Sequence, residues 1–332
     1  MGRTGGRLLA AAVLLAPGTA LAQDHAENWQ ISFSEAASPI MENIVSFNNG
    51  LLIVITAIVL FVMVLLGIVI IRFNSKRNPV PSKTTHNTLV EVLWTVVPVL
   101  ILVGIAIPSF SLLFAQYDPA RIIDNYNPDE AITVKATGRL GWFWAYQYPD
   151  NGGFEMLSQP LQTICEDRDG RFRAVNNANG DLATADAGGF ATLADCQVAI
   201  SQPATAQADV RLLSVNNPMV VPVDTVIRLQ VTAEPQGVIH AFALPSMGVK
   251  LDAVPGRIGE SWFRADREGV FYGQCSELCG QNHYFMPIEV HVVSAEQYQE
   301  WVAAMQARNQ VGANALLDQW DAERRTAQVA AL

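Results

Sequence analysis

Two long runs without charged side chains dominate the pattern of apolar and polar positions along the chain. The first, LLIVITAIVLFVMVLLGIVII (Leu51–Ile71), is long enough as a helix, at about 1.5 Å per residue, to cross a hydrocarbon layer of about 30 Å. The second, about Leu89–Ala115, contains Pro98 and Pro108, which a membrane helix tolerates when its neighbours satisfy the freed backbone groups. The pattern therefore predicts a two-helix transmembrane hairpin over residues 49–115.

A shorter apolar run lies at the N-terminus. Arg3 and Arg7 precede or flank LLAAAVLLAP (Leu8–Pro17), and Ala20 and Ala22 fit the small residues before a cleavage point. We expect residues 1–22 to be a signal peptide that is removed, with residues 23–48 forming an extracytoplasmic segment before the hairpin.

The segment between the two apolar runs, residues 72–88, has no acidic residue and four basic ones: Arg72, Lys76, Arg77 and Lys83. The positive-inside rule places such a short loop in the cytoplasm. Both termini and the large C-terminal part are then expected on the outer side, which is the periplasm if the membrane is a bacterial inner membrane.

Beyond Ala115 the pattern changes to short β-branched and aromatic stretches bounded by Gly, Pro, Asn or Asp, which are typical of strands. We expect strands at Ala131–Thr137, Trp142–Tyr148, Met219–Val223, Thr225–Thr232, Gly269–Gln274 and Met286–Val293. Many short strands predict an all-β sandwich or small barrel, here over residues 116–298. A polar insert, about residues 165–208, is expected at the surface, and residues 299–332 are expected to be a peripheral helical tail.

Composition supports this division. A mean hydropathy of +0.21 with 16% charged residues is too apolar for an ordinary soluble protein, which favours the membrane assignment. The net charge of −10 lies mostly on the exported part and argues against a nucleic-acid partner. An acidic exported domain attracts a basic soluble partner, with an encounter that weakens as salt increases.

The stretch CSELCGQNHYFM (Cys275–Met286) concentrates the chemistry of the chain. Its spacing, CxxxCxxxH, is neither the CxxCH of a covalent haem nor the CxxC of a thioredoxin-like motif. A disulfide between Cys275 and Cys279 is an alternative, but it leaves His283 and Met286 without a role. Two thiolates, an imidazole and a thioether form a soft ligand set that favours copper, and two thiolates can bridge two copper ions.

A site with two copper ions needs a second histidine outside the stretch. His25 lies by the expected cleavage point, His86 in the expected cytoplasmic loop, and His291 on the last expected strand, where it faces solvent or a partner. His240, in GVIHAFALPSMGVK, lies beside a Pro and Gly turn and is the best candidate for the distant ligand.

These residues match a family: the chain resembles subunit II of the haem-copper cytochrome c oxidases in their bacterial, mitochondrial-like form. HAFALPSMGVKLDAVPGR and FYGQCSELCGQNHYFMPIEV resemble the copper-binding segments of that family, and GWFWAYQYPD resembles its aromatic stretch. The resemblance implies a cupredoxin-like Greek-key sandwich with a binuclear CuA centre. The implied metal residues are His240, Cys275, Glu277 through its backbone carbonyl, Cys279, His283 and Met286.

The resemblance also implies roles around the copper ions. The side chain of Glu277 would reach a magnesium or manganese ion shared with subunit I, and Trp142 would receive electrons from a c-type cytochrome. The electrons would pass to the haem of subunit I, where oxygen is reduced to water with proton pumping; subunit III would be a further partner. Glu91, at the start of the second apolar run, would stand at the mouth of a proton path into subunit I.

Around the aromatic stretch the sequence departs from the family. On a single strand Trp142 and Trp144 would share one face. Some usual docking acids are displaced: the position three residues before His240 is Gly237, with Glu234 nearby, and candidates to replace them include Asp150, Glu155 and Asp252. A somewhat different c-type cytochrome, such as a membrane-anchored one, would suit this change.

Three alternatives stay open from the sequence. A quinol oxidase subunit of the same architecture would bind no copper, and the complete ligand set disfavours it. A stand-alone copper carrier would not need the hairpin, Glu91 or Glu277. Cys165 and Cys196 in the insert form either a disulfide or two free thiols.

Overall fold

The computed structural model describes residues 23–24, 29–80, 82–161, 163–168, 171–176, 191–192, 194–195 and 212–330. The expected signal peptide, residues 1–22, lies outside the described residues. Cys196 does so as well, and the two alternatives for Cys165 and Cys196, a disulfide or two free thiols, therefore both stay open.

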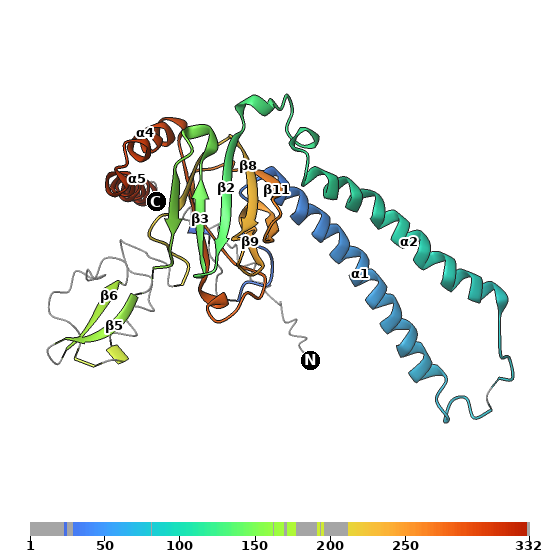
Figure 1. Ribbon diagram of the computed structural model, residues 1–332. Coiled ribbons are helices and arrows are strands. Elements are labelled where there is room, and N and C mark those ends of the chain that lie inside the picture. Colours follow the sequence, from blue (N-terminus) through green and yellow to red (C-terminus); the bar gives the residue numbers. More distant parts are fainter. Residues whose placement is uncertain are drawn as a thin grey trace, which may run out of the picture.

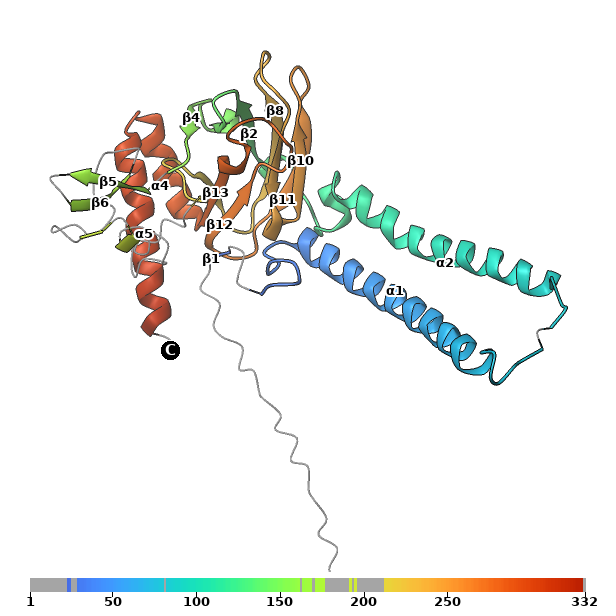
Figure 2. The same ribbon diagram turned by 90° about the horizontal axis from the view of Figure 1, so that it is seen from below.

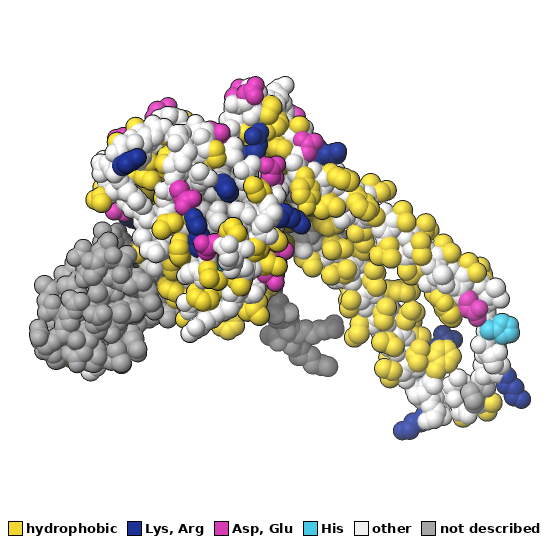
Figure 3. Space-filling model, in the orientation of Figure 1, with side chains coloured by type: hydrophobic (Ala, Val, Ile, Leu, Met, Phe, Trp, Pro, Cys, Tyr) yellow, Lys and Arg dark blue, Asp and Glu magenta, His cyan; other side chains and the backbone are white. Residues whose placement is uncertain are grey.

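Two antiparallel helices, α1 (Pro39–Arg72) and α2 (Thr88–Ala115), form a hairpin that extends from one side of the molecule (Figure 1). Both are long and apolar enough to cross a membrane. α1 begins well before Leu51 because Ser38 caps it: the Ser38 hydroxyl accepts a hydrogen bond from the N–H of Met41, and Pro39 occupies the first turn. Apolar side chains cover the length of the hairpin, and basic ones gather near its tip (Figure 3).

The remainder is a β-sandwich. One sheet has the strand order β11-β8-β2-β3-β4, and the other has the order β1-β12-β13-β7, while β9 and β10 form a two-stranded ribbon. The first sheet comprises β11 (Gly259–Arg264), β8 (Val226–Ala233), β2 (Ile132–Arg139), β3 (Phe143–Gln147) and β4 (Glu155–Ser158). The second sheet and the ribbon comprise β1 (Gln23–Asp24), β12 (Gly269–Gln274), β13 (Pro287–Val293), β7 (Met219–Pro222), β9 (His240–Leu244) and β10 (Val249–Ala253). A separate pair, β5 (Thr163–Arg168) and β6 (Arg171–Asn176), belongs to the insert.

Alternation along the strands builds the core between the sheets. β8 buries every second side chain from Ile227 onward, and Leu229 belongs to the same core cluster as Phe242 and Phe271 of other strands. The six strands expected from the sequence are present, with ends that differ by no more than two residues. Polar ends and short lengths hid β4, β10 and β11 from sequence reasoning.

Two C-terminal helices, α4 (Ala295–Gln306) and α5 (Gln310–Ala330), lie on the side of the sandwich opposite the hairpin (Figure 2). Ser294 and Gln297 start α4 with a reciprocal capping box. The tail expected over residues 299–332 is helical, but it is less peripheral than expected, because Trp301 and Trp320 are buried and belong to the main core.

Hydrogen bonds attach the hairpin to the sandwich. The Ala37 N–H donates to the Ser246 carbonyl at 2.9 Å, and the Ser38 hydroxyl donates to the Met247 carbonyl at 2.9 Å. At the end of α2, the indole N–H of Trp262 on β11 donates to the Ala115 carbonyl at 2.9 Å. The hairpin and the sandwich therefore meet through specific hydrogen bonds at the ends of both helices.

Candidate metal centre

The loop from Cys275 to Met286 connects β12 to β13. Its two ends are joined, because the Cys275 N–H donates to the Met286 carbonyl at 3.0 Å. The loop also approaches β9 closely: the Ser276 N–H donates to the Ala241 carbonyl at 3.3 Å, and a side chain at position 273 would overlap the Ala243 carbonyl. Gly273 is therefore required where β12 crosses the ribbon.

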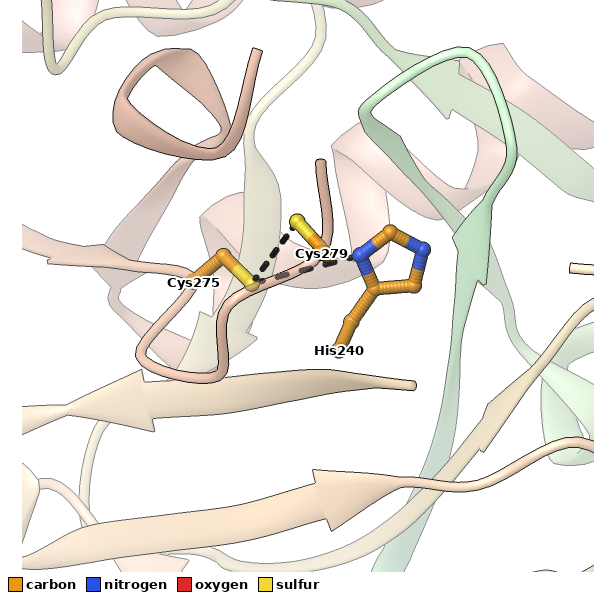
Figure 4. A group of neighbouring side chains, drawn as sticks. All are labelled: His240, Cys275 and Cys279. Atoms are coloured by element: carbon orange, nitrogen blue, oxygen red, sulfur yellow. Dashed lines mark hydrogen bonds between the residues drawn. The ribbon is translucent and has the colours of Figure 1, made fainter. Parts of the chain in front are cut away.

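Two free cysteines face each other within this loop, with their sulfur atoms 3.7 Å apart. Both side chains are buried, at 6% and 4% exposure. His240 points its Nδ1 at Cys275 Sγ, 3.9 Å away, and His240, Cys275 and Cys279 present their ligand atoms within 4.8 Å of one another (Figure 4). On the other side, His283 Nδ1 lies 3.5 Å from Cys279 Sγ.

His240 is the first residue of β9, and its side chain is fully buried. Its ring packs over Gly138 of β2, where an added Cβ would lie 2.6 Å from the ring carbon Cδ2. Trp144 lies edge-on to the same ring, with ring centroids 6.1 Å apart. A glycine and a tryptophan from the neighbouring sheet thus fix the imidazole.

Burial sets the protonation of these groups. Burial, followed by the neighbouring Cys275 thiol, raises the pKa of Cys279 to about 12, so this thiol keeps its proton at neutral pH in the metal-free chain. Burial and then the nearby His283 lower the pKa of His240, which favours its neutral, ligating form. A metal ion that binds here must displace the thiol protons.

The other expected ligands lie around this cluster. Met286 is fully buried in the core, at the end of the loop. The backbone carbonyl of Glu277 lies 3.3 Å from Cys275 Sγ, whereas the Glu277 residue is exposed. Paired thiols, each beside an imidazole nitrogen, with a buried thioether in the same loop, are a soft donor set that suits copper better than magnesium or calcium.

Trp142 lies against the cysteine loop. Its indole N–H donates to the Cys279 carbonyl at 3.2 Å, and its ring packs on Gly280, where an added Cβ would lie 3.2 Å from the ring. The expectation that Trp142 shares a strand face with Trp144 is wrong. Trp142 precedes β3 in a turn with a φ of 58°, whereas Trp144 on β3 is fully buried.

That backbone conformation is unfavourable for a bulky side chain, by about 1–3 kcal/mol. It persists because the Trp142 N–H donates to the Arg139 carbonyl at 3.0 Å while the ring is held by the cysteine loop. Sequence alternation missed this turn, although the RLG that precedes Trp142 is a plausible signal for one.

Glu91 lies far from this cluster, in the first turn of α2. One of its carboxylate oxygens accepts a hydrogen bond from the Asn87 N–H at 3.2 Å, and the Asn87 side chain in turn accepts from Leu89 and Val90. Glu91 therefore stabilises the start of the helix, whatever further role it has.

Comparison with known proteins places the chain in a family. Residues 26–112 match the transmembrane domain of cytochrome c oxidase subunit II, and residues 188–293 match the periplasmic domain of the same subunit. A probable cytochrome c oxidase subunit 2 of Rickettsia prowazekii is 44% identical over 275 residues, covering 83% of this chain and 72% of that protein. The cytochrome c oxidase subunit 2 of Cyanidium caldarium is 40% identical over 279 residues, covering 84% of this chain and 92% of that protein.

Among solved structures, the crystallised periplasmic domain of subunit II of the Bradyrhizobium japonicum cytochrome oxidase is 40% identical. It covers 55% of this chain and 99% of that one, with a TM-score of 0.39. The match to the transmembrane domain identifies α1 and α2 as the two spans of a membrane protein. By its two domain matches and its identity to full-length relatives, the chain belongs to the cytochrome c oxidase subunit II family.

Proposed function

We propose that the chain holds a binuclear CuA centre and relays electrons from a c-type cytochrome to subunit I of the oxidase. The observation that carries the proposal is the pair of unbonded, buried sulfur atoms 3.7 Å apart, each with an imidazole nitrogen beside it. When bound, two copper ions supply one-electron redox chemistry. Cys275 and Cys279 would bridge them, and His240 and His283 would each hold one.

The remaining ligands follow from the same loop. Met286 would be a weak ligand to one ion, and the backbone carbonyl of Glu277 would be a ligand to the other. The hydrogen bond that closes the loop, from Cys275 N–H to the Met286 carbonyl, fixes both ends of the ligand set. A site held this firmly changes its geometry little between oxidation states, which favours rapid electron transfer.

Trp142 would be the residue through which electrons reach the site. It is partly buried and hydrogen-bonded to the carbonyl of Cys279, so a donor that contacts its ring is one hydrogen bond from a bridging cysteine. The donor would be a c-type cytochrome with a basic face, attracted by the acidic domain.

We further propose that the exposed Glu277 side chain takes part in a magnesium or manganese site at the contact with subunit I. Glu91, on the expected cytoplasmic side of α2, would stand at the mouth of a proton path into subunit I. Oxygen reduction to water and the coupled proton pumping would take place in subunit I, and subunit III would complete the complex. The chain itself would be an oxidoreductase subunit that makes and breaks no bonds of oxygen.

The orientation in the membrane is part of the proposal. The basic loop between α1 and α2 would lie in the cytoplasm of a bacterium, with the sandwich and both termini in the periplasm. The exposed apolar side chains of both helices would contact lipid in the inner membrane and subunit I.

The test is copper loading of the full-length chain in detergent, followed by electron paramagnetic resonance. We expect a signal split by two equivalent copper nuclei. Cys275→Ser and Cys279→Ser are each expected to abolish it. Cys165→Ser, in the insert, removes a cysteine that is not in this loop and is the matched control that keeps the signal. A mononuclear copper signal in the unaltered chain would refute the proposal.

A further inference from the structure

A carboxylate outside the turn that presents Trp142 binds both the backbone and a side chain of that turn. This turn runs from Arg139, the last residue of β2, to Trp142, just before β3. Trp142 itself has a left-handed backbone, and the rigidity of the neighbouring residues decides whether it keeps that conformation. Contacts to the turn therefore control where the indole ring lies.

Glu234, directly after β8, supplies most of these contacts. Its Oε2 accepts a hydrogen bond from the Leu140 N–H at 3.0 Å, and its Oε1 lies 3.6 Å from Nη1 of Arg139. Its own N–H donates to the Gly138 carbonyl at 2.9 Å. One residue thus engages three consecutive residues that lead to Trp142.

The backbone of Glu234 is fixed as well, which makes it a firm support. Its carbonyl accepts a hydrogen bond from the Gly237 N–H at 2.8 Å, closing a tight turn after β8. β8 lies parallel to β2 and pairs with it along its length, so the carboxylate is anchored to the centre of the sheet rather than to a free loop.

A second carboxylate provides a natural comparison. Glu155 on β4 binds the other side of the same guanidinium, with Oε1 2.8 Å from Nη2 of Arg139. Glu155 meets the turn through this arginine side chain, whereas Glu234 also accepts a hydrogen bond from the turn backbone. The two acids carry the same charge, but Glu234 alone of the two accepts a hydrogen bond from the backbone of the turn.

We propose that Glu234 is a positioning residue for electron transfer: it holds the turn of residues 139–142 so that the Trp142 indole keeps its hydrogen bond to Cys279. The inference rests on the proposed role of Trp142 as the residue that receives electrons. Without the carboxylate, the Leu140 N–H loses its acceptor to water, Arg139 keeps only its ion pair with Glu155, and the strained Trp142 backbone relaxes. The indole then moves off the Cys279 carbonyl, and the path for the electron lengthens.

The test uses the assembled oxidase and reduced mitochondrial-type cytochrome c as the donor. Glu234→Ala is expected to lower the rate of electron uptake at saturating donor by about tenfold, since small displacements of a reacting group have large effects. The copper spectrum and KM stay unchanged. Glu234→Gln, which keeps an acceptor oxygen, is expected to restore most of the rate. Glu155→Ala changes a candidate docking acid that meets the turn only through Arg139, and it is expected to keep the rate at saturating donor whatever its effect on KM.

Glu234→Asp tests whether the position of the carboxylate or its charge matters. The shorter side chain keeps the charge but moves the carboxylate oxygen away from the Leu140 N–H. It is expected to behave like the alanine variant, and it also replaces that variant if the latter fails to assemble. If Glu234→Asp is normal while Glu234→Ala and Glu155→Ala both raise KM and reduce the salt dependence, Glu234 is a docking charge and the inference is wrong.

A Trp142→Phe oxidase distinguishes this failure from that of the proposed function. If Trp142→Phe loses electron uptake and Glu234→Ala does not, only the positioning role is overturned. If Trp142→Phe takes up electrons normally, the role of Trp142 fails, and the positioning role fails with it.

Discussion

The indole nitrogen of Trp142 lies 3.2 Å from the carbonyl oxygen of Cys279 and donates a hydrogen bond to it. This contact joins residues 137 positions apart, from a turn before β3 and from the loop between β12 and β13. It places a partly exposed aromatic ring in direct contact with the backbone of a cysteine of the candidate metal centre. Cys279 is therefore both a sulfur donor to the site and the residue that fixes the ring above it.

Replacing Trp142 by Phe removes the hydrogen-bond donor and part of the ring. We expect electron uptake from reduced cytochrome c to fall by about tenfold or more, because the contact to Cys279 is lost. The copper spectrum is expected to change little, because Trp142 donates to a carbonyl and does not contact either sulfur in the described hydrogen bonds. Stopped-flow kinetics of the assembled oxidase measure the rate.

Tyr284→Phe is the control for this prediction. Tyr284 lies in the same loop and is 66% exposed, so its hydroxyl is solvated and its loss is expected to leave electron uptake unchanged. Equal rates for the Trp142 and Tyr284 variants would contradict the importance of the indole contact.

A methyl group at position 138 tests how tightly His240 is held. In Gly138→Ala, the Cβ would lie 2.6 Å from Cδ2 and 3.0 Å from Cγ of the imidazole, and the ring base is tied to β9. The ring must move away from Cys275, so we expect weaker copper binding and a loss of about 1–3 kcal/mol in the free energy of unfolding. Copper stoichiometry and chemical denaturation of the full-length chain in detergent measure both.

Gly259→Ala on β11 is the matched control for Gly138→Ala. There the added Cβ would lie 3.2 Å from a terminal methyl of Leu251, which can turn aside. It is expected to bind copper normally. Normal copper binding by Gly138→Ala would show that His240 has more freedom than its packing indicates.

Buried charge at the C-terminal helix predicts a dependence of stability on pH. The His291 Nε2 lies 2.8 Å from Glu289, and its Nδ1 lies 3.3 Å from Asp321 of α5, which also pairs with Arg324. Burial lowers the pKa of His291, but these carboxylates outweigh it and the pKa is raised above 6.5. Burial also raises the pKa of Asp318 on the same helix.

The sign of the effect follows from the raised pKa of His291. Folding favours the protonated imidazole, so its contribution is fully present below pH 6.5 and is lost as the pH rises through the folded-state value. The raised pKa of Asp318 also makes the free energy of unfolding fall as the pH rises, but in a lower pH range that begins near its ordinary pKa of 3.8. The His291 contribution to the free energy of unfolding of the metal-free chain is therefore expected to be smaller at about pH 8 than at about pH 6. The lowered pKa of His240 acts in the opposite direction, so the contribution of His291 is read from the difference between the unaltered chain and a His291 variant.

His291→Gln removes the titrating group and is expected to flatten this dependence while lowering stability by about 2 kcal/mol. His86→Gln, in the loop between the membrane helices, is the control that leaves the pH dependence intact; its residue is exposed. A pH profile that is the same with and without His291 would exclude this histidine as its source.

Parts of the fold follow directly from local residue patterns. Within lipid, the backbone N–H and C=O groups of the charge-free run Leu51–Ile71 find hydrogen-bond partners in a helix. In β8, the alternation of buried and partly buried residues follows the alternation of apolar and polar residues in its sequence. The loop Cys275–Met286 places two thiols and an imidazole close together by chain connectivity alone. Their proximity to His240, by contrast, depends on the crossing of β9 and β12 at Gly273.

Long-range packing explains what the sequence did not predict. His291 was expected, as a residue of the last strand, to face solvent or a partner, but it is buried against Asp321 of α5. Trp142 was expected on a strand because WFWAYQY is strongly aromatic, but the Cys279 carbonyl and Gly280 hold it in a turn. In both cases a segment more than 25 residues away decides the conformation, and no local pattern records that contact.

The joint between the hairpin and the sandwich depends on Trp262. Its buried indole N–H donates to the carbonyl of Ala115, the last residue of α2. Trp262→Phe leaves that carbonyl without this donor, so we expect a loss of about 1–3 kcal/mol and faster amide hydrogen exchange in the last turn of α2. Trp94→Phe, at a 63% exposed position on the same helix, is expected to change neither quantity. Hydrogen exchange of the full-length chain in detergent, read by mass spectrometry, compares the two. Unchanged exchange around Ala115 in the Trp262 variant would mean that the Ala37 and Ser38 contacts alone are enough to hold the joint.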